Sequence, residues 1–345
     1  MARHDRFLKA CRREPVDCTP IWLMRQAGRY MEAYRQIRAR HSFLEMCKTP
    51  ELAVEITLQP IRRFDLDAAI IFSDILLPLE KMGAALIFSD AGGPVIEKPV
   101  RSREDVDRLK ALDIEEDLPY VLKAIEQAKT ELDNVVPLIG FSGAPFTLAS
   151  YLVEGGGSKH FQSTKTLMHT GTPVFHLLMD KLTDMAVQYL DAQIRHGAQA
   201  VQVFDSWIGI LSTQDYREYV LPHMKRLFAS LDRSVPSIHF GVDTFHLLPL
   251  MHEAGGDVVG LDWRVPIDEA WDHLGKNCAI QGNLDPTALF VSHDHIERQV
   301  QDIIGRVRGV NGHIFNLGHG ILPGTPVENV EFLVDCVHAQ GRGPA

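Results

Sequence analysis

Two arginines with a glycine between them stand directly after the first apolar run of this sequence. Arg25 and Arg29 flank Gln26, Ala27 and Gly28, and a guanidinium group suits bidentate recognition of a carboxylate or a phosphate. The position after an apolar run and the intervening glycine favour ligand contact for Arg25 and Arg29. A solvated helix face is the preferred interpretation of the next three arginines, which are Arg35, Arg38 and Arg40.

One carboxylate stands where it could stabilise a developing positive charge. Asp74 follows the apolar residues 70–72 and precedes another apolar run at 75–77. An aspartate at such a place commonly caps the helix that follows. Between apolar walls at the end of a strand it could equally stabilise a cation that forms during a reaction. Position alone does not separate these two interpretations.

Three more polar side chains are candidates for a site, each with a simpler alternative. Tyr151 fits a helix residue whose hydroxyl is satisfied in the core. Ser206 follows an apolar run but lacks the G-x-S-x-G surroundings of a hydrolase nucleophile. His319 lies between two glycines and is open to approach, as an acid, a base or a hydrogen-bond donor must be. The glycine run 155–157 lacks the lysine placement of a phosphate-binding loop, so we expect a glycine-rich lid or turn there.

The elements that must position these residues alternate along the sequence. Short apolar or β-branched runs recur and are separated by amphipathic stretches such as 177–195, 215–231 and 296–307, which are typical of helices. Eight such runs predict a parallel sheet closed into a (β/α)8 barrel, whose chemistry lies at the C-terminal ends of the strands. A hairpin insertion is expected within 84–98, after the second strand, with its turn at Asp90–Gly93. The predicted strands are 20–24, 68–72, 135–141, 200–204, 236–240, 258–261, 278–281 and 313–317.

Composition and charge narrow the class of protein further. Apolar residues make up 45% of the 345 residues, and 35 basic against 45 acidic side chains give a net charge of −10. This balance indicates a globular protein and argues against nucleic acid as a partner. No linker divides the sequence, so we expect one domain over residues 1–345. The five cysteines show no C-x-x-C pair, which indicates buried thiols in a reducing compartment.

The sequence also argues against membranes and metals as partners. No apolar stretch is long enough for a signal peptide or a membrane span, so a cytoplasmic location is expected. His252 and Glu253 lack the second histidine of H-E-x-x-H, and His293 and His295 lie at a predicted helix start. We therefore expect no metal site.

Two longer segments and three short ones resemble the uroporphyrinogen decarboxylase family. Residues 20–29 (PIWLMRQAGR) and 140–155 (GFSGAPFTLASYLVEG) are similar to its two signature segments. Residues 71–74 (IFSD), 204–206 (FDS) and 316–320 (NLGHG) also match, and 204–207 (FDSW) resembles the bacterial form. The resemblance runs from about residue 3 to the C-terminal helix, and no motif position departs from it.

This resemblance implies a cofactor-free decarboxylase of porphyrin and haem biosynthesis. It implies a (β/α)8 barrel, a tetrapyrrole substrate held at the barrel mouth, and a homodimer. The substrate contacts implied for this sequence are Arg25, Gln26, Ala27, Gly28, Arg29, Asp74, Tyr151, Ser206 and His319, with Arg25, Arg29 and Asp74 as catalytic residues. The proton donor stays open, because an arginine is a poor acid and His319 could instead bind a propionate.

Two other functions remain to be weighed. A related barrel methyltransferase would use zinc and would need a His-x-Cys pair near the fifth strand. The sequence has His239-Phe240-Gly241 there, so this alternative is poorly supported. A non-catalytic tetrapyrrole carrier could share the arginines but would not require Asp74.

Overall fold

A curled parallel sheet of seven strands forms the centre of the molecule, in the order β1-β4-β5-β6-β7-β8-β9. The computed structural model describes residues 3–89 and 93–342. All seven strands overlap apolar runs that the sequence predicted as strands, so these predictions are confirmed. Their side chains are almost all buried, as expected of a sheet covered on both faces. The strands are β1 (Ala69–Ile70), β4 (Leu138–Gly143), β5 (Ala200–Asp205), β6 (Ser237–Gly241), β7 (Val258–Gly260), β8 (Ala279–Gln281) and β9 (His313–Ile314).

The predicted first strand, residues 20–24, fills the gap between the two edges of this sheet. Ile21 forms a single parallel bridge with Phe315 beyond the end of β9. The Phe315 amide donates to the Pro20 carbonyl at 2.8 Å, and on the other side the Asp67 amide donates to the Ile21 carbonyl at 2.8 Å. The segment closes the barrel without becoming a regular strand. Pro20 has no amide hydrogen to donate, and the Ile21 amide donates to the Asp67 carboxylate.

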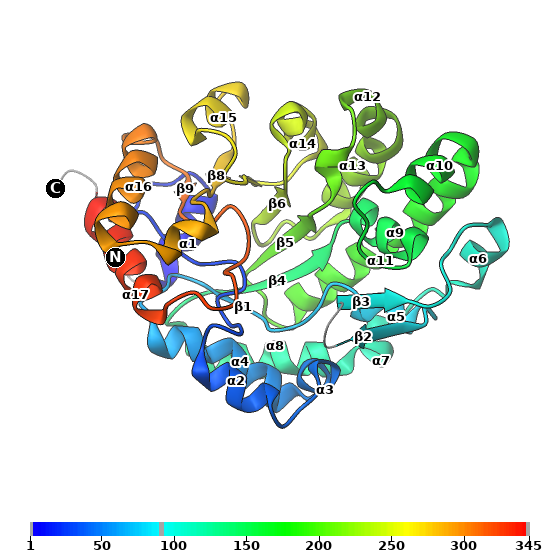
Figure 1. The fold of residues 1–345 in the computed structure, drawn as a ribbon, viewed down its shortest axis with the longest axis horizontal. Coiled ribbons are helices and arrows are strands. Elements are labelled where there is room, and N and C mark those ends of the chain that lie inside the picture. Colours follow the sequence, from blue (N-terminus) through cyan, green and yellow to red (C-terminus); the bar gives the residue numbers. More distant parts are fainter. Residues whose placement is uncertain (1–2, 90–92, 343–345) are drawn as a thin grey trace.

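Helices surround the strands on the outside (Figure 1). The predicted amphipathic stretches 177–195, 215–231 and 296–307 lie mainly in α11, in α12 to α13, and in α16, which confirms them. The helices are α1 (Arg3–Cys11), α2 (Glu32–Arg38), α3 (Phe43–Lys48), α4 (Pro50–Arg63), α5 (Leu77–Lys81), α6 (Arg103–Arg108), α7 (Ile114–Asp117), α8 (Pro119–Leu132), α9 (Pro145–Glu154), α10 (Gln162–Thr170), α11 (Thr172–Arg195), α12 (Thr213–Asp215), α13 (Leu221–Ser230), α14 (Leu248–Ala254), α15 (Ile267–His273), α16 (His293–Arg306) and α17 (Val327–Gln340). Short 3₁₀ turns are η1 (Ile208–Ile210), η3 (Phe245–Leu247) and η4 (Pro286–Phe290), and η2 (Tyr216–Val220) is a π-helical turn within the helix that runs from α12 to α13.

Helix α1 closes the N-terminal end of the barrel. Its residues Phe7, Ala10 and Cys11 are buried in one apolar cluster with side chains from the barrel strands. Among these apolar side chains the Trp22 indole donates to Gln281 at 2.9 Å, and the Gln281 amide donates to Gln202 at 3.0 Å. The interior is therefore a packed core below the mouth, as in other barrels of this kind.

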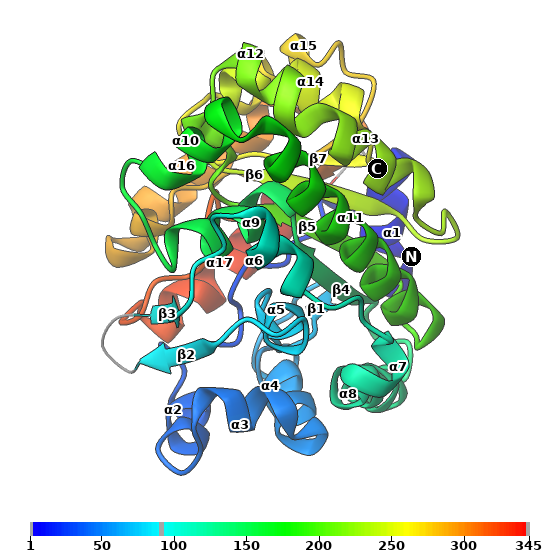
Figure 2. The same ribbon diagram turned by 90° about the vertical axis from the view of Figure 1, so that its right-hand side faces the viewer.

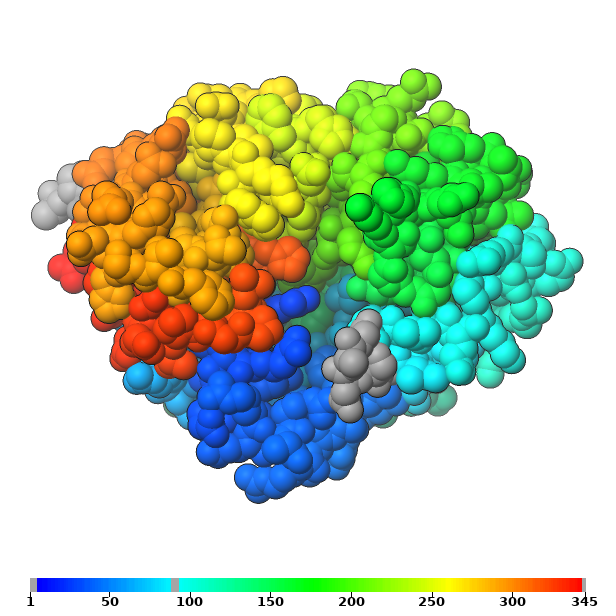
Figure 3. Space-filling model, in the orientation of Figure 1, coloured from blue at the N-terminus to red at the C-terminus, as the bar shows by residue number. Residues whose placement is uncertain are grey.

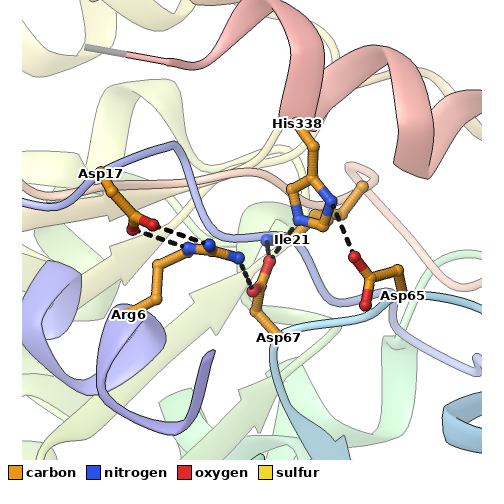
Figure 4. Close-up of polar contacts among 6 residues, drawn as sticks. All are labelled: Arg6, Asp17, Ile21, Asp65, Asp67 and His338. Atoms are coloured by element: carbon orange, nitrogen blue, oxygen red, sulfur yellow. Dashed lines mark hydrogen bonds and ion pairs between the residues drawn. The ribbon is translucent and has the colours of Figure 1, made fainter. Parts of the chain in front are cut away.

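A buried carboxylate joins α1, the first barrel segment and the C-terminal helix at this closed end (Figure 4). Asp67 has no exposed surface and accepts hydrogen bonds from Arg6 at 2.6 Å and from the Ile21 amide at 2.8 Å. His338 of α17 lies with Nε2 2.8 Å from the same carboxylate. Arg6 is also held by Asp17 through two hydrogen bonds of 2.9 Å. Every oxygen of this buried charge thus has a partner.

The predicted insertion is an antiparallel hairpin of β2 (Leu86–Ser89) and β3 (Gly93–Ile96). It follows β1, which is the second predicted strand, as expected, but the short helix α5 lies between them. Of its expected turn at Asp90–Gly93, residues 90–92 lie outside the described residues. The Ile96 amide donates to the Gly155 carbonyl at 2.9 Å, which fastens the hairpin to the end of α9. Figure 2 shows the hairpin and α1 at opposite ends of the molecule.

Two further expectations concern cysteines and membranes. All five thiols are buried and free, as the sequence indicated. Within residues 3–89 and 93–342, no helix combines the length and apolar character needed to cross a membrane.

Candidate active site

The C-terminal ends of the strands surround a cavity of about 780 Å³. Figure 3 shows a hollow at the centre of this face, bordered by segments from both halves of the chain. All nine candidate residues from the sequence line it: Arg25, Gln26, Ala27, Gly28, Arg29, Asp74, Tyr151, Ser206 and His319. They meet because the carboxyl ends of parallel strands converge at one end of a barrel.

Arg25 is held in a tight turn at the end of the first barrel segment. Its backbone adopts a left-handed conformation with φ of 59°, which is uncommon for a residue with a side chain. The Gln26 amide donates to the Leu23 carbonyl at 2.9 Å, and the Ile321 amide donates to the Met24 carbonyl at 2.8 Å. These bonds compensate for the unfavourable conformation and direct Arg25 into the cavity. The side chains of Arg25 and Arg29 are both exposed.

The two glycines around His319 allow close approach of neighbouring groups. A Cβ at Gly320 would overlap Cδ of Arg25 and lie 2.6 Å from its Cγ. A Cβ at Gly318 would overlap the Trp263 amide nitrogen. Arg25 thus lies against the bare α-carbon of Gly320, beside His319. Burial and the nearby positive charges of Arg25 and Arg264 lower the pKa of His319, so its imidazole is neutral at pH 7.

Asp74 lies in the turn before α5 and also lines the cavity, although Leu76 and not Asp74 is the N-cap residue of that helix. Its Oδ1 accepts a hydrogen bond from the Leu76 amide at 2.8 Å, one residue before α5 begins. It also faces the cavity, where it is the only carboxylate among the described lining residues. Burial raises its pKa to about 6, against the opposing influence of the Leu76 amide and the charge of Arg25. Asp74 is therefore mostly ionised at pH 7, although few neighbouring groups stabilise its negative charge.

Tyr151 and Ser206 come from adjacent strand ends. Tyr151 lies on α9, which follows β4, and Ser206 directly follows β5. Burial raises the pKa of Tyr151 to about 12, and the negative charge of Asp74 adds to this shift. The phenol is neutral and lies near enough to Asp74 to sense its charge. Tyr151 is therefore a cavity residue rather than the core residue that its position alone suggested.

The segment between the two arginines serves the cavity through its backbone. The Gln26 side chain is 1% exposed; its Oε1 accepts from the Leu23 amide at 3.1 Å and its Nε2 donates to the Ala68 carbonyl at 3.2 Å. Its amide group is thus occupied within the protein. A Cβ at Gly28 would lie 3.2 Å from the Arg25 carbonyl oxygen. This tripeptide shapes the turn that presents Arg25 and Arg29.

The structure adds lining residues that the sequence reasoning missed. Arg38 lines the cavity with Tyr34, one turn earlier on the same face of α2. Arg35 behaves as expected: it is exposed, pairs with Glu32, and donates to the Arg29 carbonyl at 3.0 Å. The four-residue spacing of Tyr34 and Arg38 was the available signal. Aromatic lining residues complete the wall, namely Phe43, Phe72, Phe141, Phe204, Trp207 and Phe240.

The glycine-rich segment after α9 is a turn, one of the two expected forms. Gly155 ends α9 in a left-handed conformation with φ of 86°. A Cβ there would lie 3.0 Å from Cγ of Pro99 and 3.2 Å from the Ile96 carbonyl oxygen. Glycine is therefore needed for both the turn and the contact with the hairpin.

Among its described lining residues the cavity combines three cationic arginines, one carboxylate and an aromatic wall. Such a lining suits a ligand with several carboxylates around an aromatic, electron-rich ring system. Within the described part of the chain, no three histidine, cysteine, aspartate or glutamate side chains gather as a metal-binding group. His239, at the position that the zinc alternative would use, is fully buried and 3.7 Å from Asp205.

Comparisons with known proteins show what the whole chain is similar to. The family model for uroporphyrinogen decarboxylase matches residues 2–340. A uroporphyrinogen decarboxylase of Carboxydothermus hydrogenoformans is 56% identical over 336 residues, covering 97% of this chain and 96% of the relative. One from Sorangium cellulosum is 53% identical over 340 residues, covering 98% and 97%. Among solved structures, a methyltransferase from Methanosarcina mazei superimposes with a TM-score of 0.84 at 20% identity, covering 98% of each chain, which establishes a shared fold.

Proposed function

The chain belongs to the uroporphyrinogen decarboxylase family, and we propose that the cavity at its barrel mouth is the active site. The enzyme is a carboxy-lyase that removes the carboxyl groups of four acetate side chains of uroporphyrinogen III as CO2, giving coproporphyrinogen III in porphyrin biosynthesis. The observation that carries the site is the convergence of Arg25, Arg29 and Asp74 on one cavity.

Asp74 stabilises the cation on which the chemistry depends. Decarboxylation needs an electron sink, and a pyrrole supplies one when it is protonated at its α-carbon. The C–C bond to the carboxylate then breaks, CO2 leaves, and the electron pair neutralises the iminium. A second proton reaches the exocyclic carbon and the first is lost, so the net change is replacement of CO2⁻ by H. Asp74 binds the pyrrole N–H groups and stabilises the cation through its weakly compensated charge.

Arg25 and Arg29 bind and orient the substrate carboxylates. Their guanidinium forks match acetate and propionate groups, and the rigid turn at Arg25 fixes one of them relative to Asp74. Orientation of this kind lowers the entropic part of the barrier. Tyr151, Ser206 and His319 complete the polar contacts, with His319 acting as a neutral hydrogen-bonding group.

Two candidates for the proton donor remain within this proposal. Arginine delivers a proton only with difficulty because its pKa is so high. The lowered pKa of His319 leaves its imidazole neutral at pH 7, so it would have to be protonated during the catalytic cycle.

The proposal extends to the whole chain. We infer that residues 1–345 form one catalytic domain, that the enzyme is a cytoplasmic homodimer, and that it needs no added cofactor. The closed barrel, whose two terminal helices meet at Asp67, supports the single domain. Sedimentation equilibrium measures the mass directly, and a monomer at micromolar concentration would contradict the dimer.

The activity is tested by anaerobic incubation with uroporphyrinogen III in the presence of a chelator. Oxidised products are separated by their number of carboxylates. We expect porphyrins with seven, six, five and four carboxylates to appear in turn. Binding without loss of carboxylates would favour a carrier, and neither binding nor turnover would contradict the assignment.

The site is tested by a variant of Arg25 in the same assay. Arg25→Ala is expected to lower kcat/KM by about 10² or more, because it removes a charged, oriented contact. Arg40→Ala, which removes an arginine of the same stretch that does not line the cavity, is the matched control and should leave turnover unchanged.

A further inference from the structure

Trp207 stands next to the proposed site but has no role in the mechanism so far. It follows Ser206 directly after β5 and lines the cavity. Its ring lies against the Tyr151 ring, with 3.9 Å between centroids and 34° between planes. This is the shortest centroid separation among the aromatic pairs recorded for the described residues. A ring packed this closely restricts the rotation of its neighbour.

Phe161 supports Trp207 from a second direction. Their ring centroids are 5.0 Å apart at an angle of 59°, and Phe161 is only 4% exposed. The Phe161 amide donates to the Ser158 hydroxyl at 2.9 Å. Four residues after Phe161, the Lys165 side chain of α10 donates to the Ile210 carbonyl at 2.7 Å, which ties α10 to the segment after Trp207. Trp207 is therefore held in place by its surroundings.

A buried hydrogen bond joins α9, which carries Tyr151, to β5, which precedes Trp207. Asp205, the last residue of β5, accepts from the Thr147 hydroxyl of α9 at 2.9 Å, and both side chains are fully buried. Thr147 and Tyr151 are four residues apart and so lie on one face of α9. The Asp205 contact fixes the position of the helix relative to β5, and the Trp207 contact fixes the Tyr151 ring.

We propose that Trp207 is a positioning residue that holds the Tyr151 phenol toward Asp74 and the substrate. This inference rests on the proposed function of Tyr151. The two aromatic rings act as one wall of the cavity, and the phenol keeps the orientation that the reaction needs. Loss of the indole ring frees Tyr151 to rotate, so the effect of the change on catalysis passes through Tyr151.

A double-mutant cycle tests this dependence. Trp207→Leu is expected to lower kcat/KM about tenfold in the otherwise unchanged enzyme, because a small misplacement of a contact is costly. In a Tyr151→Phe background, which lacks the hydroxyl, the same change should cost less than about twofold. Equal effects in both backgrounds, or no effect in either, would overturn the proposal.

Conservative variants keep the test independent of folding. Trp207→Phe retains an aromatic ring against Tyr151 and should keep most of the activity, with an unchanged melting temperature. A Trp207→Phe enzyme as impaired as Trp207→Leu would contradict the positioning role. Trp263→Phe is the control, since Trp263 lies 4.3 Å from the Arg264 guanidinium rather than against a tyrosine; kcat/KM should not change.

The outcome also separates this inference from the proposed site. A Tyr151→Phe enzyme with normal kcat/KM would show that the Tyr151 hydroxyl has no role in catalysis, and the positioning role of Trp207 would then be contradicted as well. An impaired Tyr151→Phe enzyme with an additive Trp207→Leu effect would leave the site intact and contradict the positioning role alone.

Discussion

Two aspartates seven residues apart, on either side of β1, have opposite surroundings. Asp67 lies at the closed end of the barrel, where Arg6, His338 and the Ile21 amide all contact its carboxylate. Asp74 lies at the open end, where, among the described residues, only the Leu76 amide donates to its carboxylate. The negative charge of an aspartate is thus stabilised by several partners at the closed end and by a single hydrogen bond at the open end.

This difference shows how the barrel divides stability from chemistry. A buried carboxylate with complete partners holds three distant segments together, and its charge has little left to offer a ligand. A carboxylate with one partner is costly to bury, and that cost is recovered when a cationic ligand or transition state supplies the missing partner. The arrangement predicts that substitutions at the two ends will affect different quantities.

The largest effect is expected at Asp67. Asp67→Ala leaves Arg6, which is largely buried, and the Ile21 amide without their partner, so the free energy of unfolding should fall by about 3–5 kcal/mol. The measurement is denaturant unfolding. Asp17→Ala is the matched control, because Asp17 also binds Arg6 but is 39% exposed; it should cost about 1 kcal/mol or less. Equal losses in the two variants would mean that burial of Asp67 does not matter.

Asp74→Asn should affect the rate and spare the fold. The amide oxygen can still accept from Leu76, but the negative charge is lost, so kcat should fall by about 10²–10³. Turnover and thermal unfolding are measured together. Asp113→Asn is the control, since Asp113 accepts the Glu115 amide in the same way on the exposed surface. A melting temperature that drops with the rate would show that Asp74 is structural.

The sequence indicated the mouth of the barrel better than its floor. Strand-end residues such as Arg25, Asp74 and Ser206 could be placed together because parallel strands all end on one side. The contacts of Asp67 could not be predicted, since Arg6 and His338 are more than 60 residues away along the chain. Arg38 was assigned to solvent because its approach to the cavity depends on how α2 folds back over the mouth. The absence of a regular strand at residues 20–24 has a similar cause, because the Ile21 amide donates to the Asp67 carboxylate instead of to a neighbouring strand.

Gly320→Ala tests how finely the mouth is arranged. The added methyl would overlap Cγ and Cδ of Arg25, so the guanidinium must move and kcat/KM should fall about tenfold. Steady-state kinetics and thermal unfolding are measured together. Gly305→Ala in α16 is the control, because its added Cβ meets no atom within 4 Å; it should leave kinetics unchanged and slightly favour folding. Normal kinetics in Gly320→Ala would show that Arg25 tolerates displacement.

The smallest effect is expected from a single step of pH: from pH 6 to pH 5 the rate should change by less than tenfold, and the effect of pH has opposite signs for rate and stability. Asp74 has a pKa of about 6 in the folded protein and near 3.8 in the unfolded chain. The charge needed for catalysis is lost below pH 6, so kcat/KM should fall up to tenfold for each further unit. Between pH 4 and 6 the folded state binds more protons than the unfolded state, so stability from this group is present at pH 4 and is lost as the pH rises through 6.

Asp74→Asn isolates this group from every other titrating residue. The free energy of unfolding of the variant, minus that of the unchanged enzyme, should increase from pH 4 to pH 6 and then level off. A difference that stays flat across this range would mean that the pKa of Asp74 is not raised. The carboxylate would then be as well compensated at the mouth as Asp67 is at the floor, and the contrast between the two ends of the barrel would have no electrostatic basis.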